Sequence, residues 1–105
     1  MTLGELIDEL ERHNPRIVVK EGFDNPHSYR GWYDRLAFQT ASSISIGDML
    51  QVARGALGST FYGWKGGEYV MREWTECYLA NPGELGEELG VRLLRYMLAE
   101  VEDLA

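Results

Sequence analysis

The sequence predicts an α+β domain in which a small antiparallel sheet is packed by three helices on one face. Apolar residues recur at helical spacing in three segments, and short β-branched or alternating segments lie between them. The predicted strands and helices do not alternate regularly along the chain, so the pattern does not indicate a parallel sheet. Because the chain has 105 residues, of which 45% are hydrophobic, we expect one core and a single domain over residues 1–105.

The first helix is expected to begin after Thr2, because Thr2 and Glu5 have the spacing of a capping box. Apolar residues follow at helical intervals: Leu3, Ile7 and Leu10. The Asn14-Pro15 pair ends this helix. Residues 16–20 are rich in β-branched side chains and are expected to form a strand.

The next segment is expected to contain one strand between two irregular connections. Residues 22–30 are predicted to be an ordered loop, with Asp24-Asn25-Pro26 as its turn. Residues 32–39 are the second predicted strand. Residues 40–43 are polar and are expected to connect this strand to a helix.

The second helix is expected to begin after Ser45, with Asp48 at the matching capping position. Ile44 can pack on Met49 as a hydrophobic staple, and Gly58 ends the helix. The predicted apolar stripe consists of Met49, Val52, Ala53, Ala56 and Leu57.

The remaining elements are a hairpin, a strand and a helix. Residues 59–64 and 68–71 are expected to pair around a turn at residues 65–67. Residues 74–80 alternate and predict another strand, which is followed by a turn at residues 81–83.

The last helix is predicted over residues 84–104. One side of it would carry Leu85, Leu89, Leu93, Met97, Val101 and Leu104. In the strand before it, Trp74 and Tyr78 are large enough to be core or sheet-face residues.

The charge balance limits the classes of partner. Ten basic and seventeen acidic residues give a formal net charge of -7, which argues against non-specific DNA or RNA binding. The same balance permits a small anionic ligand in a local pocket, or docking on a basic protein surface. We expect no membrane span and no signal peptide, and the lone Cys77 is typical of a reducing cytoplasm.

Aromatic residues and cations gather in two segments that glycines interrupt. Seven of the twelve aromatic residues lie in residues 29–33 and 61–69. Rings beside an Arg or a Lys can stack on a planar ligand and neutralise its phosphate. Arg30, which lies between two aromatic residues, is the strongest candidate. The predicted ligand-binding residues are His27, Tyr29, Arg30, Trp32, Tyr62, Trp64 and Lys65.

Signs of catalysis are weak by comparison. His13, His27 and Cys77 lack the spacing of a metal site, so we predict no metal, no cofactor and no catalytic residue. An alternative is a general acid or base at His27, oriented by Asp24 or Asp34. Residues 65–67 lack the pattern of a Walker loop, which leaves a ligand-contacting loop and a plain hairpin turn equally open.

Two stretches carry a resemblance to a known family. Residues 27–38 contain His-Ser-Tyr-Arg-Gly-Trp-Tyr and Leu-Ala-Phe, and residues 63–71 contain Gly-Trp-Lys-Gly-Gly-Glu-Tyr and a Met. Together with the opening residues 1–7 and the closing leucine-rich segment, they resemble a family of small proteins encoded by tailed phages, especially those of actinobacteria. The resemblance covers nearly the whole chain and transfers no residue roles.

The resemblance implies an accessory protein that counters host defence in the host cell cytoplasm. One route is a homo-oligomeric, non-enzymatic sponge, similar in role to anti-Thoeris and anti-CBASS proteins, which binds a cyclic nucleotide or a cyclic ADP-ribose. The alternative is an acidic inhibitor that docks on a host defence protein, as many anti-CRISPR proteins do. A third and weaker possibility is a small hydrolase that uses His27.

Overall fold

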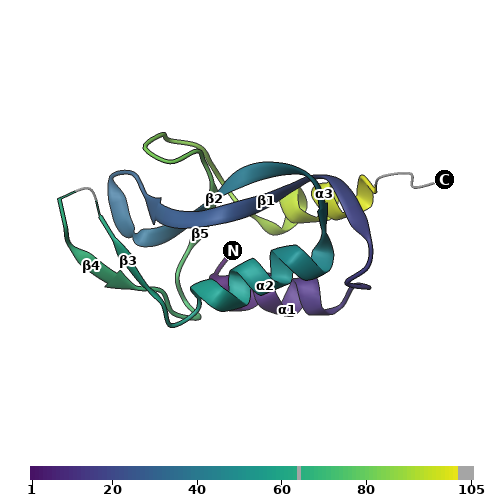
Figure 1. The fold of residues 1–105 in the computed structure, drawn as a ribbon, viewed down its shortest axis with the longest axis horizontal. Helices are drawn as coiled ribbons and strands as arrows, with labels where there is room; N and C mark the ends of the chain where they lie inside the picture. Colours follow the sequence, from purple (N-terminus) through teal and green to yellow (C-terminus); the bar gives the residue numbers. More distant parts are fainter. Residues whose placement is uncertain (64, 102–105) are drawn as a thin grey trace.

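A computed structural model describes residues 1–63 and 65–101, which form three helices and six strands (Figure 1). In chain order these are α1 (Leu3–Glu11), β1 (Val18–Tyr29), β2 (Trp32–Ser45), α2 (Ile46–Ala56), β3 (Thr60–Tyr62), β4 (Glu68–Val70), β5 (Cys77–Leu79), β6 (Glu87–Glu88) and α3 (Val91–Ala99). The predicted α+β class with three helices is confirmed. None of the helices in the described residues has the length and apolar content needed to cross a membrane.

The strands form a four-stranded sheet in the order β1-β2-β5-β6 and a separate β3-β4 hairpin. One pair departs from the antiparallel arrangement predicted from the sequence, because β2 and β5 are parallel. Parallel neighbours need a long crossover connection. Here α2 and the β3-β4 hairpin supply that connection, so the main sheet is mixed.

Strands β1 and β2 are longer than predicted and pair as a hairpin, because residues 22–29 and 40–43 are strand and only Arg30 of the predicted loop lies in a turn. Gly22 and Phe23 pair with Ala41 and Thr40, and the ladder between the two strands continues toward Tyr29. The predicted turn residues instead make a bulge, with a register shift between Asp24 and Pro26 and a left-handed Asn25 at φ 49°. Pairing with a long partner strand thus overrides local turn preference.

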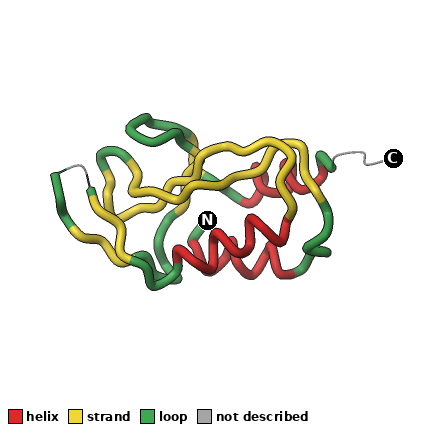
Figure 2. Tube along the Cα trace, viewed as in Figure 1, coloured by secondary structure: helices red, strands yellow, loops and turns green. Residues whose placement is uncertain are grey.

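The core lies between the main sheet and the helices. Helices α1 and α2 run side by side beneath the strands, and α3 packs against β1 (Figure 2). The rings of Phe23 and Phe38 meet at the centre, with centroids 4.5 Å apart. All three helices contribute to this core, through Leu3, Leu6, Leu10, Met49, Ala53, Leu94 and Met97 among others.

Two of the three predicted helix starts, those after Thr2 and Ser45, are confirmed. The Glu5 amide donates to Thr2 Oγ1 at 3.2 Å, and the Thr2 amide donates to Glu5 Oε1 at 3.0 Å. These hydrogen bonds to Thr2 lower the pKa of Glu5 below its ordinary value. At α2, Ser45 Oγ accepts a hydrogen bond from the Asp48 amide at 3.0 Å.

The predicted helix over residues 84–104 is wrong in its first half. Glu87 and Glu88 form β6 instead, and α3 begins only after Gly90. Gly86 and Gly90 disfavour a helix at this point, and pairing with β5 supplies the backbone hydrogen bonds. Leu85 is consequently 63% exposed rather than packed. Leu104 lies outside the described residues.

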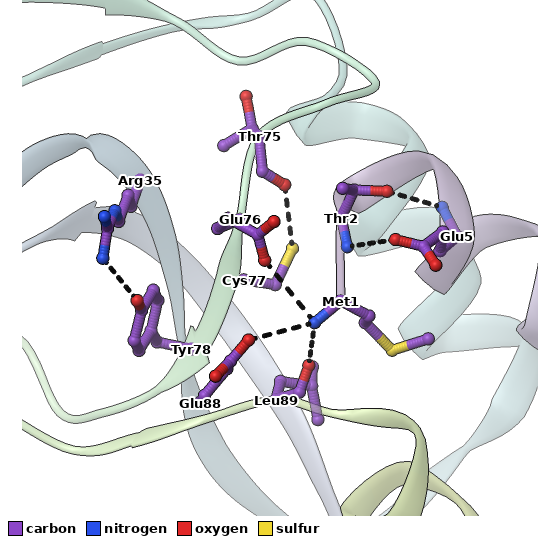
Figure 3. Close-up of polar contacts among 10 residues, drawn as sticks. All are labelled: Met1, Thr2, Glu5, Arg35, Thr75, Glu76, Cys77, Tyr78, Glu88 and Leu89. Atoms are coloured by element: carbon purple, nitrogen blue, oxygen red, sulfur yellow. Dashed lines mark hydrogen bonds and ion pairs between the residues drawn. The ribbon is translucent and has the colours of Figure 1, made fainter.

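The amino group of Met1 joins the start of α1 to the edge of the sheet (Figure 3). It donates to the Leu89 carbonyl at 2.8 Å and lies 3.6 Å from Glu76 Oε2 and 3.7 Å from Glu88 Oε1. Cys77 is buried next to this network, and burial raises the pKa of its thiol to about 12. The thiol is therefore protonated at neutral pH and a poor nucleophile.

Candidate functional site

The two aromatic segments meet at one cavity of about 690 Å³. Figure 1 shows the β3-β4 hairpin projecting beside the closed end of the β1-β2 hairpin. The turn that follows β5 completes the wall. The residues that line the cavity, which we call the cationic cavity, are His27, Ser28, Arg30, Tyr33, Tyr62, Lys65, Pro82 and Gly83.

A close backbone approach holds the second segment against the first. A Cβ atom at Gly63 would lie 2.8 Å from Cγ of Tyr33, so the backbone rests directly on this ring. Tyr69 lies on the hairpin's other strand, and its ring centroid is 6.3 Å from that of Tyr33. The Gly63 amide also donates to the Gly67 carbonyl at 2.8 Å, which closes the hairpin. Glycine at position 63 is therefore what allows the hairpin to reach the cavity.

Arg30 is placed by a two-residue turn at the closed end of the β1-β2 hairpin. Tyr29 pairs with Trp32, and Gly31 between them has a φ of 84°, which favours glycine. The Arg30 Nη1 group donates to the Gly83 carbonyl at 3.0 Å. A guanidinium has five N–H donors, so this contact orients Arg30 and leaves donors for an anion.

The residues that line the cavity differ in exposure, and the two cations form its exposed rim. His27, Ser28 and Tyr33 are half-buried, whereas Arg30 and Lys65 are exposed. The His27 Nδ1 atom lies 2.9 Å from the Asn25 carbonyl oxygen, so its partner is not the carboxylate of Asp24 or Asp34.

Two buried side-chain atoms of the lining residues have no hydrogen-bond partner among the described residues. They are Nε2 of His27 and Oγ of Ser28, and both are shielded from solvent. A buried polar atom without a partner costs about 1–3 kcal/mol, so such atoms are rare in folded proteins. This pair therefore needs a local explanation.

The electrostatic character of the cationic cavity contrasts with that of the whole chain. Arg30 and Lys65 line it beside His27, and no carboxylate is among its described lining residues. Neither cation makes an ion pair within the described part of the chain. In a chain with a net charge of -7, this arrangement favours a small anion at one place.

A second group of rings lies on the face of the sheet away from the core. Tyr29 is 4% exposed and stacks on Tyr78 with centroids 4.1 Å apart and on Trp32 at 5.7 Å. The Tyr29 hydroxyl donates to the Gly86 carbonyl and accepts from the Gly86 amide. Arg35 donates to the Tyr78 hydroxyl at 2.6 Å. We call Tyr29, Trp32, Arg35 and Tyr78 the outer stack.

The structure thus brings together four of the predicted ligand residues: His27, Arg30, Tyr62 and Lys65. Tyr29 and Trp32 belong to the outer stack and do not line the cationic cavity, so their ligand contact stays a prediction. Trp64 lies outside the described residues.

Some lining residues were not predicted from the sequence. Ser28 and Tyr33 adjoin predicted residues, and their place in the same segments was the only signal. Pro82 and Gly83 showed turn chemistry alone. Trp74, which was expected in the core or on the sheet, is 74% exposed, because β5 begins only at Cys77. Within the described residues, no three His, Cys, Asp or Glu side chains are grouped to hold a metal ion.

Comparison of the chain with protein-family models, curated proteins and solved structures identifies no match.

Proposed function

We propose that this protein binds and sequesters a small nucleotide-derived anion in the cationic cavity. The observation that carries the proposal is the lining of that cavity, where Arg30, Lys65 and His27 converge with no carboxylate among the described lining residues. Tyr33 and Tyr62 add aromatic surface on which a base can stack. The chemistry fits a phosphate held by the cations and a flat group held by the rings.

The proposed setting is that of a phage accessory protein which removes a host immune signal, as the resemblance to small tailed-phage proteins implies. Sequestration requires binding without turnover, so the proposed protein is not an enzyme. The exposed rim formed by Arg30 and Lys65 leaves one side of the cavity for a second protomer to cover. We therefore propose a homo-oligomer that acts in the host cytoplasm.

A thermal-shift screen against cyclic mononucleotides, cyclic dinucleotides and cyclic ADP-ribose isomers tests the proposal. A ligand at a hundred times its Kd stabilises the folded state by about 2.7 kcal/mol, which gives a clear rise in Tm. The double variant Arg30→Ala/Lys65→Ala is expected to lose this rise. No shift with any member of the panel would overturn nucleotide binding.

The acidic inhibitor remains a second candidate, and the exposure of Trp74 favours it. Trp74 and Leu57 flank a smaller cavity of about 300 Å³ together with Arg72 and Glu73. Exposed aromatic side chains are common anchors of protein interfaces. Under this alternative, Trp74→Ala abolishes co-purification of a host defence protein, whereas Arg30→Ala does not.

The third candidate, a hydrolase that uses His27, is separated by the fate of the ligand. His27 has a carbonyl partner, which orients the ring but does not stabilise its charge as a carboxylate would. Ligand recovered intact after denaturation of the complex supports sequestration. Recovery of a hydrolysed product would support the enzyme.

A further inference from the structure

Two pairs of side chains in the lining of the cationic cavity each combine one ring with one cation. Arg30 and Tyr33 come from the closed end of the β1-β2 hairpin, which we call the first half-site. Tyr62 and Lys65 come from the end of the β3-β4 hairpin, the second half-site. Resting on the proposed function, we propose that the ligand is a dinucleotide, with one base and one phosphate for each half-site.

The two half-sites have the same spacing in the sequence but the opposite order. In the first the cation precedes the ring by three positions, and in the second the ring precedes the cation by three. A glycine follows the first residue of each, Gly31 and Gly63. Gly31 has a φ of 84°, and Gly63 lets the backbone of its hairpin approach the Tyr33 ring. Two separate elements thus present the same combination of ring and cation to one cavity.

The side chains of both half-sites are accessible to a ligand. Arg30, Tyr62 and Lys65 are exposed, and Tyr33 is half-buried. Within the residues that the structure describes, neither cation makes an ion pair, and the Arg30 guanidinium makes one hydrogen bond, to the Gly83 carbonyl. Each cation therefore has donors available for a phosphate of its own.

The size of the cavity and the placement of the cations favour two nucleotide units over one. The volume of about 690 Å³ lies well inside the range of ligand pockets, about 300–1,000 Å³. The bond to Gly83 holds Arg30 at the turn of one hairpin, whereas Lys65 lies in the turn of the other. A mononucleotide at either half-site would leave the second ring and the second cation without a partner. A dinucleotide engages both.

The affinity and stoichiometry of mononucleotides and dinucleotides test this inference. The probes are adenosine 5′-monophosphate and the linear dinucleotide pApA, which joins two such units, together with guanosine 5′-monophosphate and pGpG. Titration calorimetry and NMR give the affinities and the number of molecules bound per chain. We expect one dinucleotide or two mononucleotides per chain. The dinucleotide with the preferred base is expected to bind about 100-fold more tightly, because its second unit is tethered at a high effective concentration.

Variants of each half-site connect this preference to the cavity. Tyr62→Ala/Lys65→Ala removes one exposed ring and one exposed cation, so the fold is expected to be retained. It should bind one mononucleotide per chain and lose the preference for the dinucleotide, and Arg30→Ala should reduce that preference from the other side. Arg92→Ala/Tyr96→Ala is the matched control, because it removes an exposed cation and an exposed ring of α3 that do not line the cavity.

The outcomes separate this inference from the proposed function. Equal affinity for dinucleotides and mononucleotides, or a single bound mononucleotide per chain, overturns the two half-sites and leaves nucleotide binding intact. Failure of both dinucleotides while another nucleotide binds has the same meaning. A preference that persists in Tyr62→Ala/Lys65→Ala overturns the assignment of the second half-site. If no probe binds at millimolar concentration and the cyclic nucleotides also fail to bind, the proposed function itself is overturned.

Discussion

The cationic cavity and the outer stack are built from the same residue types, but they differ in whether their polar and charged groups have partners within the protein. Each combines aromatic rings with arginine, and both begin in residues 27–35. In the outer stack the Tyr29 hydroxyl and the Arg35 guanidinium already have partners within the protein. Among the residues that line the cavity, two buried side-chain atoms lack hydrogen-bond partners and two exposed cations lack counter-ions within the described part of the chain.

The difference shows that rings beside a cation do not by themselves indicate a binding site. Arg35 lies 5.7 Å from the ring centroids of both Trp32 and Tyr78, so its charge interacts with rings inside the protein. Arg30, in contrast, makes a single hydrogen bond within the described residues, to the Gly83 carbonyl. Free hydrogen-bonding capacity distinguishes the two regions. Substitutions in the outer stack are therefore expected to reduce mainly stability, whereas substitutions in the cationic cavity are expected to reduce mainly nucleotide binding.

The largest expected effect is on stability, in the outer stack. Tyr29→Ala is expected to lower the free energy of unfolding by about 3–5 kcal/mol, because it removes a buried ring that stacks on Tyr78. Tyr29→Phe retains the ring and loses only the hydroxyl contacts with Gly86, at a cost of about 1 kcal/mol. Urea unfolding measures both. If Tyr29→Ala instead costs little stability but abolishes nucleotide binding, Tyr29 contacts the ligand and is not mainly structural.

The next effect is on binding, at the rim of the cavity. Arg30→Ala is expected to weaken nucleotide binding about 10- to 100-fold, the range for a hydrogen bond to a charged group. Its stability should change by less than about 0.5 kcal/mol, since the side chain is exposed. Arg12→Ala, which removes an exposed arginine paired with Glu9, is the matched control for lost charge. Titration calorimetry gives the affinities.

The opposite outcome for Arg30 would be equally informative. A loss of several kcal/mol in Arg30→Ala with unchanged affinity would mean that the bond to Gly83 serves the fold. Arg30 would then resemble Arg35, and the contrast between the two regions would disappear.

The sequence contained enough information for the fold class and for the first two helix starts, since these depend on local patterns. The capping pairs at Thr2 and Ser45 appear where predicted, because side-chain caps involve residues only three positions apart. The extent of β1 and β2 was not predictable in this way. Residues 24–26 have strong turn chemistry, yet a ladder with β2 absorbs them as a bulge.

The candidate site was predictable in part. The concentration of rings and cations identified His27, Arg30, Tyr62 and Lys65, which line one cavity. Alternation along a bulged strand could not show that Tyr29 points away from them, because a bulge changes which residues share a face. Gly83 contributes through its contact with Arg30, which lies 53 positions away in the sequence, so no local pattern predicts it.

A change at the hairpin tests whether the close approach of Gly63 builds the cavity. Gly63→Ala places a Cβ atom 2.8 Å from the Tyr33 ring, which must move or separate from the hairpin. We expect a loss of about 1–3 kcal/mol in stability and weaker nucleotide binding. Gly55→Ala is the control, because a Cβ there meets nothing within 4 Å and alanine stabilises a helix by about 1 kcal/mol. Unchanged binding in Gly63→Ala would show that the cavity tolerates a displaced hairpin.

The smallest expected effect distinguishes the exposed end of the outer stack from a ligand site. Trp32 is 47% exposed and contributes one aromatic pair, so Trp32→Ala is expected to cost about 0.5–1.5 kcal/mol and to leave nucleotide affinity unchanged. A double-mutant cycle with Arg35→Ala should give a coupling of about 0.5–1 kcal/mol, the size of an exposed cation–π contact. If Trp32→Ala instead weakens binding as much as Arg30→Ala does, the ligand reaches beyond the cavity. The outer stack would then be part of the binding surface, and its internal contacts would serve to pre-orient it.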